Sequence, residues 1–429
     1  MAAQLARDPE LGDIEGFVRA IVSDCQLGGP VAPTAGRPAV LPALALWSGL
    51  LICLVRGFSS QRDLWRLLSS GRFWDFPRYA ISDQAVYHRL ERDGAAPLVT
   101  LFAQVSQVLA KRLERWMEDD LAPFASQVVA IDETTLDPVA RKLPVLRGVV
   151  TEETIPGKLA GRFDLRRQQW QTLQFHPDFR QNERVLAREL VADLPAESLI
   201  LFDLGYFGFA WFDDLTTARQ WWLSRLRAKT SYRVEHVFYQ EGQVLDALVW
   251  LGAYRADRAR FLVRLVQMPY GKQVRRYITN VTDPRQLSMD AIARLYARRW
   301  DIEMAVQLVK QHLGLGLLWS SKPVVVQQQI WAVLIIAQIV QALRMEAAAR
   351  AGVDVFDVSL PLLVRYLPRY AAAGHDPLRA FLEDGETLGF IRPSRRVQIS
   401  APLPDLETYH WSPPTLVRER APRYAGRRC

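Results

Sequence analysis

The sequence predicts a mixed α/β protein that begins with an all-helical region. Residues 1–120 have helical periodicity throughout. Two segments, 127–132 and 198–208, each contain a short apolar run that ends on an aspartate, and residues 229–286 are rich in Val, Tyr, Phe and Leu between turn signals. A 3.6-residue period indicates helices, and short apolar runs bounded by turns indicate strands. The chain therefore combines helices with strands that end on carboxylates.

Composition indicates a large folded core and an anionic partner. The 429 residues are 49% hydrophobic and 23% charged, which excludes a disordered chain. There are 54 Lys and Arg against 46 Asp and Glu, so the net charge is +8. Most basic residues are Arg, whose planar fork suits phosphate better than the point charge of Lys. We expect an anionic polymer as partner.

The cysteines and the apolar stretches exclude several protein classes. Cys25, Cys53 and Cys429 are too scattered for a disulfide framework or a zinc site, which indicates a reducing compartment. The N-terminus lacks the apolar segment of a signal peptide. Two uncharged stretches, 38–55 and 323–343, are interrupted by Pro, Gly or several Gln, so we expect buried helices and no membrane span. The expected location is the cytoplasm.

The N-terminal 120 residues are expected to form five helices. These cover 13–23, 41–56, 60–68, 82–92 and 97–118. Ser82 is a suitable cap for the fourth helix. That helix carries Arg89 and Arg92, so the third and fourth helices are compatible with a DNA-reading helix-turn-helix. A plain helical bundle explains the same pattern equally well.

The rest of the chain alternates between strands and helices. Strands are expected at 127–132, 161–170, 171–177, 198–208 and 220–228, an antiparallel β unit at 229–286, and helices at 180–195, 288–312 and 325–350. Ser288 is expected to cap the first helix after the β unit. The last 60 or so residues are punctuated by Pro and end in a basic tail.

Four polar residues share one stripe of the helix at 288–312. On a wheel of about 100° per residue, Tyr296, Arg299, Glu303 and Lys310 lie within about 60° of one another, beside the apolar face. Charged residues that border a core are less common than charged residues opposite it. A set of helical salt bridges, such as Arg299 to Glu303, is the alternative explanation.

Three carboxylates on separate elements suggest an oxygen-only metal site. Asp132 and Asp203 each end a predicted buried strand, where α/β proteins place their sites. Glu303 lies beside the buried face of the later helix. Taken singly, each aspartate could be a cap or a turn residue. Together they suit Mg²⁺ or Mn²⁺, two of which about 4 Å apart can activate the attacking oxygen and stabilise the leaving oxygen of a phosphodiester.

These residues resemble the DDE transposases of the insertion sequence four family. The spacing of Tyr296, Arg299, Glu303 and Lys310 matches the Tyr-Arg-Glu-Lys signature of that family. "VVAIDETTL" resembles its first catalytic box, "LILFDLGYFG" its second, and the β-rich segment 229–286 its insertion. The resemblance covers about 120–350.

The resemblance implies a ribonuclease-H-like mixed sheet flanked by helices and interrupted by a β-rich insertion. The domain division is then a helical DNA-binding region, a first and a second part of the catalytic core around the insertion, and a C-terminal helical region with the basic tail. The helical DNA-binding region covers 1–120, and the two parts of the catalytic core cover 121–228 and 287–350. The insertion between them covers 229–286, and the C-terminal region covers 351–429.

The resemblance also implies a catalytic mechanism and partners. Asp132, Asp203 and Glu303 would bind two Mg²⁺, for which Mn²⁺ would substitute. The residues that would contact double-stranded DNA are Tyr296, Arg299, Lys310, Tyr206, Trp250, Arg89 and Arg92. The enzyme would nick the inverted-repeat ends of its own element and join the 3′-hydroxyls to target DNA. We expect a homodimer on DNA in a bacterial, nucleoid-associated location.

One step of that mechanism stays open. Family members that form a DNA hairpin stack a flipped base on an aromatic residue of the insertion. The candidates here are Trp250, Tyr254, Tyr270 and Tyr277, and the core of the β unit is the alternative place for Trp250. Two other functions also remain: a metal nuclease of the same fold without strand transfer, and a non-catalytic DNA-binding protein derived from a transposase.

Overall fold

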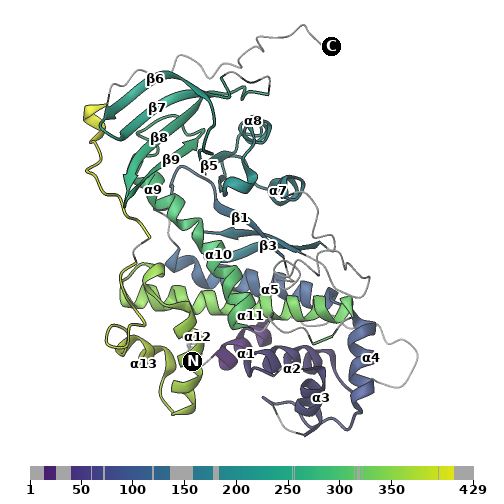
Figure 1. The fold of residues 1–429 in the computed structure, drawn as a ribbon. Coiled ribbons are helices and arrows are strands. Elements are labelled where there is room, and N and C mark those ends of the chain that lie inside the picture. Colours follow the sequence, from purple (N-terminus) through teal and green to yellow (C-terminus); the bar gives the residue numbers. More distant parts are fainter. Residues whose placement is uncertain are drawn as a thin grey trace, which may run out of the picture.

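A nine-stranded mixed sheet and a helical assembly beneath it make up the protein (Figure 1). The computed structural model describes residues 14–25, 40–58, 60–70, 73–117, 120–135, 158–176, 183–253, 255, 257–313, 315, 319–320, 322–394 and 396–409.

The N-terminal region is helical, close to the predicted ranges. The helices are α1 (Ile14–Asp24), α2 (Ala43–Val55), α3 (Gln61–Ser70), α4 (Asp83–Asp93) and α5 (Ala96–Leu113), followed by a 3-10 turn at Glu114–Trp116. Ser82 caps α4 as expected, since its side chain accepts a hydrogen bond from the backbone N–H of Ala85.

The first five strands have the ribonuclease-H-like order that the resemblance implies. They are β1 (Val128–Thr135), β2 (Lys158–Asp164), β3 (Gln169–His176), β4 (Leu199–Leu201) and β5 (Trp221–Arg225). The sheet order is β3-β2-β1-β4-β5, with β2 antiparallel to β1 and β4 parallel to both β1 and β5. The predicted mixed α/β fold class is confirmed.

The β-rich segment extends this sheet. Its strands are β6 (Tyr232–Glu241), β7 (Val244–Leu251), β8 (Val263–Tyr270) and β9 (Gln273–Thr279), all antiparallel to their neighbours. Because β9 pairs with β5 through Leu223 and Thr279, the sheet continues from the core into the inserted strands without a break. The sequence suggested a small unit of its own, whereas backbone pairing joins it to the core.

The alternation of side chains along β1 and β4 gives the sheet two differently covered faces. Val129 and Ile200 pack with α7 (Glu183–Val191) and α8 (Phe209–Thr217) in one apolar cluster. Val128 and Leu199 pack in the other cluster, with α9 (Met289–Arg298) and α10 (Trp300–Gln307). Figure 1 shows α7 and α8 on one side of the sheet and α9 and α10 on the other.

The helix predicted at 288–312 is not one straight helix. Ser288 caps it as expected, by accepting from the N–H of Ala291, and the chain then bends at Arg299 between α9 and α10. A π-helical turn, Leu308–His312, ends the segment. The constant 100° step of the wheel is therefore wrong from the π turn onward and so for Lys310, because a π turn holds more residues than an α turn.

The long helix α11 (Pro323–Ala351) is the centre of the lower assembly and contacts α1, α2, α4 and α5. It is long and apolar enough to cross a membrane, but 78% of its most apolar window is buried within the protein. Two of its buried glutamines bond other elements: Gln328 donates to the carbonyls of Leu90 and Gly94, and Gln338 bonds the backbone of Trp170. These bonds join β3 and α4 to α11. The amide of Gln341, also buried, has no partner among the described residues.

The C-terminal part packs on α11 and then returns to the inserted strands. Its helices are α12 (Leu360–Ala372) and α13 (Pro377–Glu383), with 3-10 turns at Val355–Asp357 and Leu406–Thr408. A β-bridge between Tyr270 and Ile399 ties the following segment to β8. The basic tail at 418–428 lies outside the described residues.

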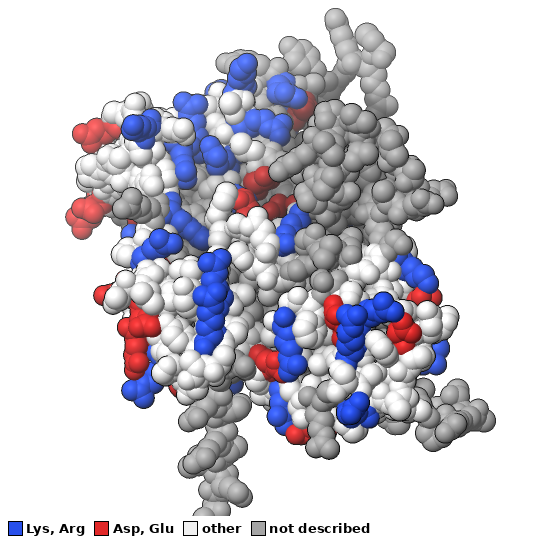
Figure 2. Space-filling model, turned by 60° about the horizontal axis from the view of Figure 1, so that its bottom comes forward, with Lys and Arg blue, Asp and Glu red and all other residues white. Residues whose placement is uncertain are grey.

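Charged side chains are unevenly spread on the surface. In the view of Figure 2, Lys and Arg gather in the upper part of the face and on both sides of a small central group of Asp and Glu. Basic side chains around an acidic centre are the arrangement expected if a polyanion approaches a metal-binding site.

Candidate active site

Asp132 lies in β1 on the sheet face that α10 covers. It alternates with Val128 and Ala130, which pack in the cluster containing α10. The pKa of Asp132 is raised from 3.8 to about 7, chiefly by burial and in smaller part by the carboxylates of Asp203 and Glu303. The N–H of Glu133 and the charge of Arg299 act in the opposite direction. A partly buried carboxylate with a raised pKa and two acidic neighbours marks a functional site candidate.

Asp203 is held at the same sheet edge as Asp132. β1 and β4 run parallel, and Ala130 is paired with Leu201. Asp132 and Asp203 each follow their member of this pair by two residues, so both lie at the same end of the two strands. Asp203 caps the 3-10 turn Leu204–Tyr206, where its Oδ1 accepts from the N–H of Gly205 at 2.7 Å. The side chain thus has a local turn role and still lies within electrostatic reach of Asp132.

Arg299 links the acidic group to the helix. Its Nη2 donates to Glu303 Oε1 at 2.5 Å, which is the i,i+4 pair that the sequence offered as an alternative. Its Nε and Nη1 are buried without a hydrogen-bond partner in the described part of the chain. Burial lowers the pKa of Arg299, but Tyr296 and Glu303 outweigh it, and the pKa is raised. The group stays charged with two unused donors.

Tyr296 stands behind Arg299 and is 8% exposed. The guanidinium carbon of Arg299 lies 5.7 Å from its ring centroid, and the ring of Tyr277 lies 5.2 Å away on the other side. Burial raises the pKa of Tyr296 to about 12. Its ring packs beside Arg299, and its hydroxyl keeps its proton at every physiological pH.

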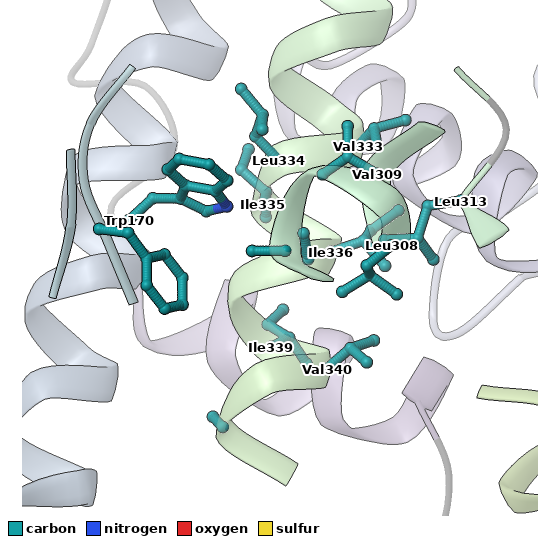
Figure 3. Packing of buried hydrophobic residues seen from close by; sticks show 14 of the residues in the cluster. Trp170, Leu308, Val309, Leu313, Val333, Leu334, Ile335, Ile336, Ile339 and Val340 are labelled. Carbon is teal, nitrogen blue, oxygen red and sulfur yellow. The ribbon is translucent and has the colours of Figure 1, made fainter. Parts of the chain in front are cut away.

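Lys310 projects toward β1 from the π turn. Its Nζ donates to Thr134 Oγ1 at 2.5 Å, and it lines a small cavity with Asp132 and Trp170. Figure 3 shows why the turn is fixed: Val309 and Leu313 lie against residues of α11 such as Val333. The apolar side of the turn packs on α11, so its polar side faces β1.

The three carboxylates come from separate elements, but they do not converge. No group of three His, Cys, Asp or Glu among the described residues lies close enough together to hold a metal ion. Carboxylates brought together without a cation repel one another. Arg299 takes the place of that cation by pairing with Glu303. The donor set is oxygen only and fits a divalent cation once Glu303 leaves Arg299.

The other predicted contacts lie elsewhere or in the core. Tyr206 is 2% exposed and packs on Phe202. Trp250 is 8% exposed in the core of the β unit, with its N–H donated to Glu235 at 2.8 Å, so the alternative place for Trp250 is the observed one. Arg89 and Arg92 are on α4, at the foot of the molecule in Figure 1.

The surroundings of those residues limit what they can contact. Arg89 is paired with Asp93 and donates to the carbonyl of Leu41 at 3.0 Å, whereas Arg92 is largely exposed. Tyr270 and Tyr277 are buried, and Tyr254 lies outside the described residues. None of the described aromatic candidates of the insertion therefore offers an open ring face.

Sequence analysis missed three neighbours of the site. Lys158 is 3% exposed and forms a 3.0 Å ion pair with Glu133, beside Asp132. Gly161 pairs with Asp132 across β1 and β2. Trp300 follows Arg299 and is 48% exposed, which is unusual for its size. Only Trp300 had a signal in the sequence, since it is a large apolar residue that lies outside the apolar face of its helix.

Comparison with known proteins gives the family context. Residues 159–339 match the model of the transposase DDE domain. The transposase InsG of insertion sequence element IS4 from Escherichia coli K12 is 25% identical over 37% of this chain and 38% of its own length. The putative transposase y4zB of Sinorhizobium fredii is 27% identical over 32% of this chain and 39% of its own length.

One solved structure is also similar. It is a piggyBac transposase in a synaptic complex with hairpin DNA, with a TM-score of 0.39 and 11% identity over 91% of this chain and 84% of that one. The curated relatives are matched over about two fifths of their lengths. The matched family model begins after Asp132 and includes Asp203 and the Tyr-Arg-Glu-Lys segment.

Proposed function

We propose that this chain, a DDE-type transposase related to insertion sequence element IS4, cuts the ends of its own insertion sequence and joins them to target DNA. The observation that carries the proposal is the acidic group around Asp132. Its pKa of about 7 reflects burial near two further carboxylates, contributed by the loop after β4 and by α10. Such a group is costly unless a cation offsets it.

Divalent metal ions, two Mg²⁺ in this proposal, would activate the attacking oxygen and stabilise the leaving oxygen of the phosphodiester. Asp132, Asp203 and Glu303 would hold them. Asp132 must lose its proton to do so, because only the carboxylate form is a good ligand. The raised pKa places this step near neutral pH.

Arg299 and Glu303 would change partners when DNA binds. In the structure Glu303 neutralises Arg299, and two donors of Arg299 have no partner among the residues described. A phosphate of the DNA end offers the oxygen pairs that a guanidinium binds best. Arg299 would then bind the strand and release Glu303 toward the metal site. Lys310, whose ammonium lies beside Thr134, would bind a flanking phosphate.

The partners proposed are double-stranded DNA ends, target DNA and a second copy of the chain. Arg92 on α4 is largely exposed and would bind a DNA backbone, although both Arg92 and Arg89 would have to leave their pairs with Asp93. We propose a homodimer on two DNA ends in the bacterial cytoplasm, associated with the nucleoid. The +8 charge favours such an association.

Strand transfer separates this proposal from the nuclease alternative. The purified chain would be incubated with Mg²⁺, a duplex carrying its own terminal inverted repeat and a supercoiled target plasmid. A transposase gives a product in which the end is joined to the plasmid. Cleavage of the duplex without any joined product would instead support a nuclease of the same fold. Binding without cleavage in either Mg²⁺ or Mn²⁺ would support a non-catalytic DNA-binding protein.

A further inference from the structure

A second pocket lies beside the loop that follows β4, on the sheet face covered by α7 and α8. Its volume is about 510 Å³, within the range of small-ligand sites. It is lined by the first turn of α8, by residues 227–231 between β5 and β6, and by side chains from α7 and the β7–β8 connection. Asp132 and α10 belong to the other face, so this pocket is separate from the carboxylate group.

The lining of this pocket is strongly basic. Arg188, Arg227, Lys229 and Arg255 supply four cations against the one anion, Asp257, among the described lining residues. Arg188 and Arg255 have carboxylate partners at 2.8 and 2.7 Å. Lys229 has no ion pair with any carboxylate in the described part of the chain. The pocket therefore carries positive charge that its own residues do not neutralise.

The first turn of α8 adds backbone donors to these cations. Gly208 is the N-cap residue, no side chain caps the helix, and its first turn has no acidic residue. A helix N-terminus with free N–H groups attracts anions. Trp211 in this turn is 4% exposed, and its indole N–H has no hydrogen-bond partner among the residues described. The backbone donors of α8 and the cations thus line one cavity, whereas the indole nitrogen of Trp211 is buried.

The aromatic lining does not favour a stacked base. Arg227 lies over the ring of Phe207 at 5.1 Å, and Arg255 over the ring of Phe209 at 5.7 Å. Both ring faces already have a guanidinium partner, and both phenylalanines are buried. Donors and cations without an open ring face suit a phosphate group better than a nucleobase.

We propose that this pocket binds a phosphate group and that, given the proposed function, the phosphate belongs to a DNA backbone passing the active site. Arg227 connects the two places, because its Nη2 donates to the carbonyl of Leu204 at 2.9 Å, next to Asp203. A strand held in the pocket would therefore contact the same loop that presents Asp203. The assignment to DNA rests on the proposed function, whereas the phosphate site does not.

The test uses the full chain and blocks the pocket with Ala210→Glu. Ala210 is exposed at the second position of α8, where a carboxylate is favourable to the helix. Inorganic phosphate is titrated by calorimetry, and melting is followed in parallel. We expect phosphate to bind and stabilise the wild type, and Ala210→Glu to bind at least about tenfold more weakly while melting no lower than the wild type. Equal phosphate binding by both proteins would overturn the proposal.

A second variant removes cations without adding an anion. Lys229→Gln with Arg255→Gln is compared with Lys272→Gln with Arg285→Gln, which changes the charge equally. Arg285 is a matched control because it pairs with an aspartate two residues away, as Arg255 does, at a similar exposure. Binding of a duplex with the terminal repeat is measured at several salt concentrations, and the logarithm of the binding constant is plotted against the logarithm of the salt concentration. The slope for the pocket variant should be shallower by about 0.9 for each DNA phosphate that the pocket no longer neutralises. Slopes equal to those of the control would overturn the DNA assignment.

The two proposals fail in different ways. If the wild type cuts DNA and Ala210→Glu binds inorganic phosphate as tightly as the wild type, the phosphate site is wrong and the transposase proposal stands. If phosphate binds in the wild type and not in Ala210→Glu, but no DNA is bound or cut, the phosphate site stands and the proposed function is wrong.

Discussion

Asp132 shows how burial prepares a residue for metal binding. Its carboxylate is in the field of Asp203 and Glu303, and its pKa of about 7 means that this carboxyl is about half protonated at neutral pH in the metal-free protein. A divalent cation must displace this proton. Metal binding and cleavage are therefore coupled to pH at a single side chain.

The first prediction concerns the pH dependence of metal binding. Below pH 7 the proton competes with Mg²⁺ at Asp132, so the affinity for Mg²⁺ should rise steadily from pH 5.5 to about 7.5 and then level off. Mg²⁺ titrations by calorimetry at several pH values measure this. An affinity that does not change across that range would contradict the assignment of Asp132 as a ligand.

The second prediction is the effect of Asp132→Asn on stability without metal. The folded pKa lies above the unfolded value of 3.8, so the folded state binds the extra proton and its stability falls as the pH rises from about 4 to 7. Asparagine removes this loss, which is at most about 4 kcal/mol. Urea unfolding with EDTA should find the variant more stable than the wild type at pH 8 and nearly equal at pH 4, and cleavage should be abolished.

The third prediction concerns Arg299. Its planar fork has two unpartnered buried donors, which a lysine cannot replace. Arg299→Lys should weaken binding of the terminal repeat by about 10- to 100-fold and keep the fold. Arg294→Lys, an exposed residue of α9 paired with Asp290, is the control and should bind normally. Equal binding by both variants would show that Arg299 serves only its pair with Glu303.

At the scale of elements, strand pairing and helix irregularity place the site. Asp132 and Gly161 are paired across β1 and β2, and a Cβ at Gly161 would lie 2.5 Å from the ring of Trp170. The bend at Arg299 and the π turn orient Arg299, Glu303 and Lys310 toward β1. These features depend on close packing between a sheet and two helices.

The fourth prediction uses that packing. Gly161→Ala forces Trp170 to move, so the free energy of unfolding should fall by about 1–3 kcal/mol. Cleavage of DNA should also become slower, because Asp132 shifts with the strand. Adding Trp170→Leu makes space, so the double variant should lose less stability than the two single losses added together. Strict additivity in urea unfolding would mean that the packing at Gly161 is not tight.

A buried charge group holds the bend between α9 and α10. Asp301, fully buried, accepts from Arg298, Gln168 and Arg396 at 3.0, 2.7 and 2.7 Å. Burial lowers the pKa of the nearby Arg344 to about 10, and the charge of Asp301 opposes this shift. The group joins the segment after β2, the helix bend, α11 and the C-terminal segment.

The fifth prediction follows from this group. Asp301→Asn leaves Arg298 and Arg396 without their anion, so stability should fall by about 3–5 kcal/mol. Asp290→Asn, in an exposed pair on the same helical segment, should change stability by no more than about 0.5 kcal/mol. Equal melting temperatures for the two variants would show that the buried group does not hold the bend.

At the scale of the whole molecule, the sequence predicted element types, order and cap residues well. Ser82 and Ser288 could be identified as caps because capping is a local property. The pairing of β9 with β5 could not be predicted, since it joins residues more than fifty positions apart. The bend at Arg299 and the π turn are also set by tertiary packing. Sequence spacing alone grouped Tyr296, Arg299, Glu303 and Lys310 as site residues. The positions of Lys158 and Gly161 beside the site could not be predicted, because they depend on the register between β1 and β2.

The account as a whole depends on the carboxylates acting on DNA, and Glu303→Gln tests this most directly. The variant keeps the size of the side chain and removes its charge, and Glu383→Gln is the control because Glu383 also pairs with an Arg four residues away. Cleavage of a duplex with the terminal repeat is measured in Mg²⁺. The account predicts that Glu303→Gln binds the duplex without cutting it, while the wild type and Glu383→Gln cut. Cleavage by all three proteins at equal rates would contradict it and leave Arg299 and Glu303 as a structural ion pair.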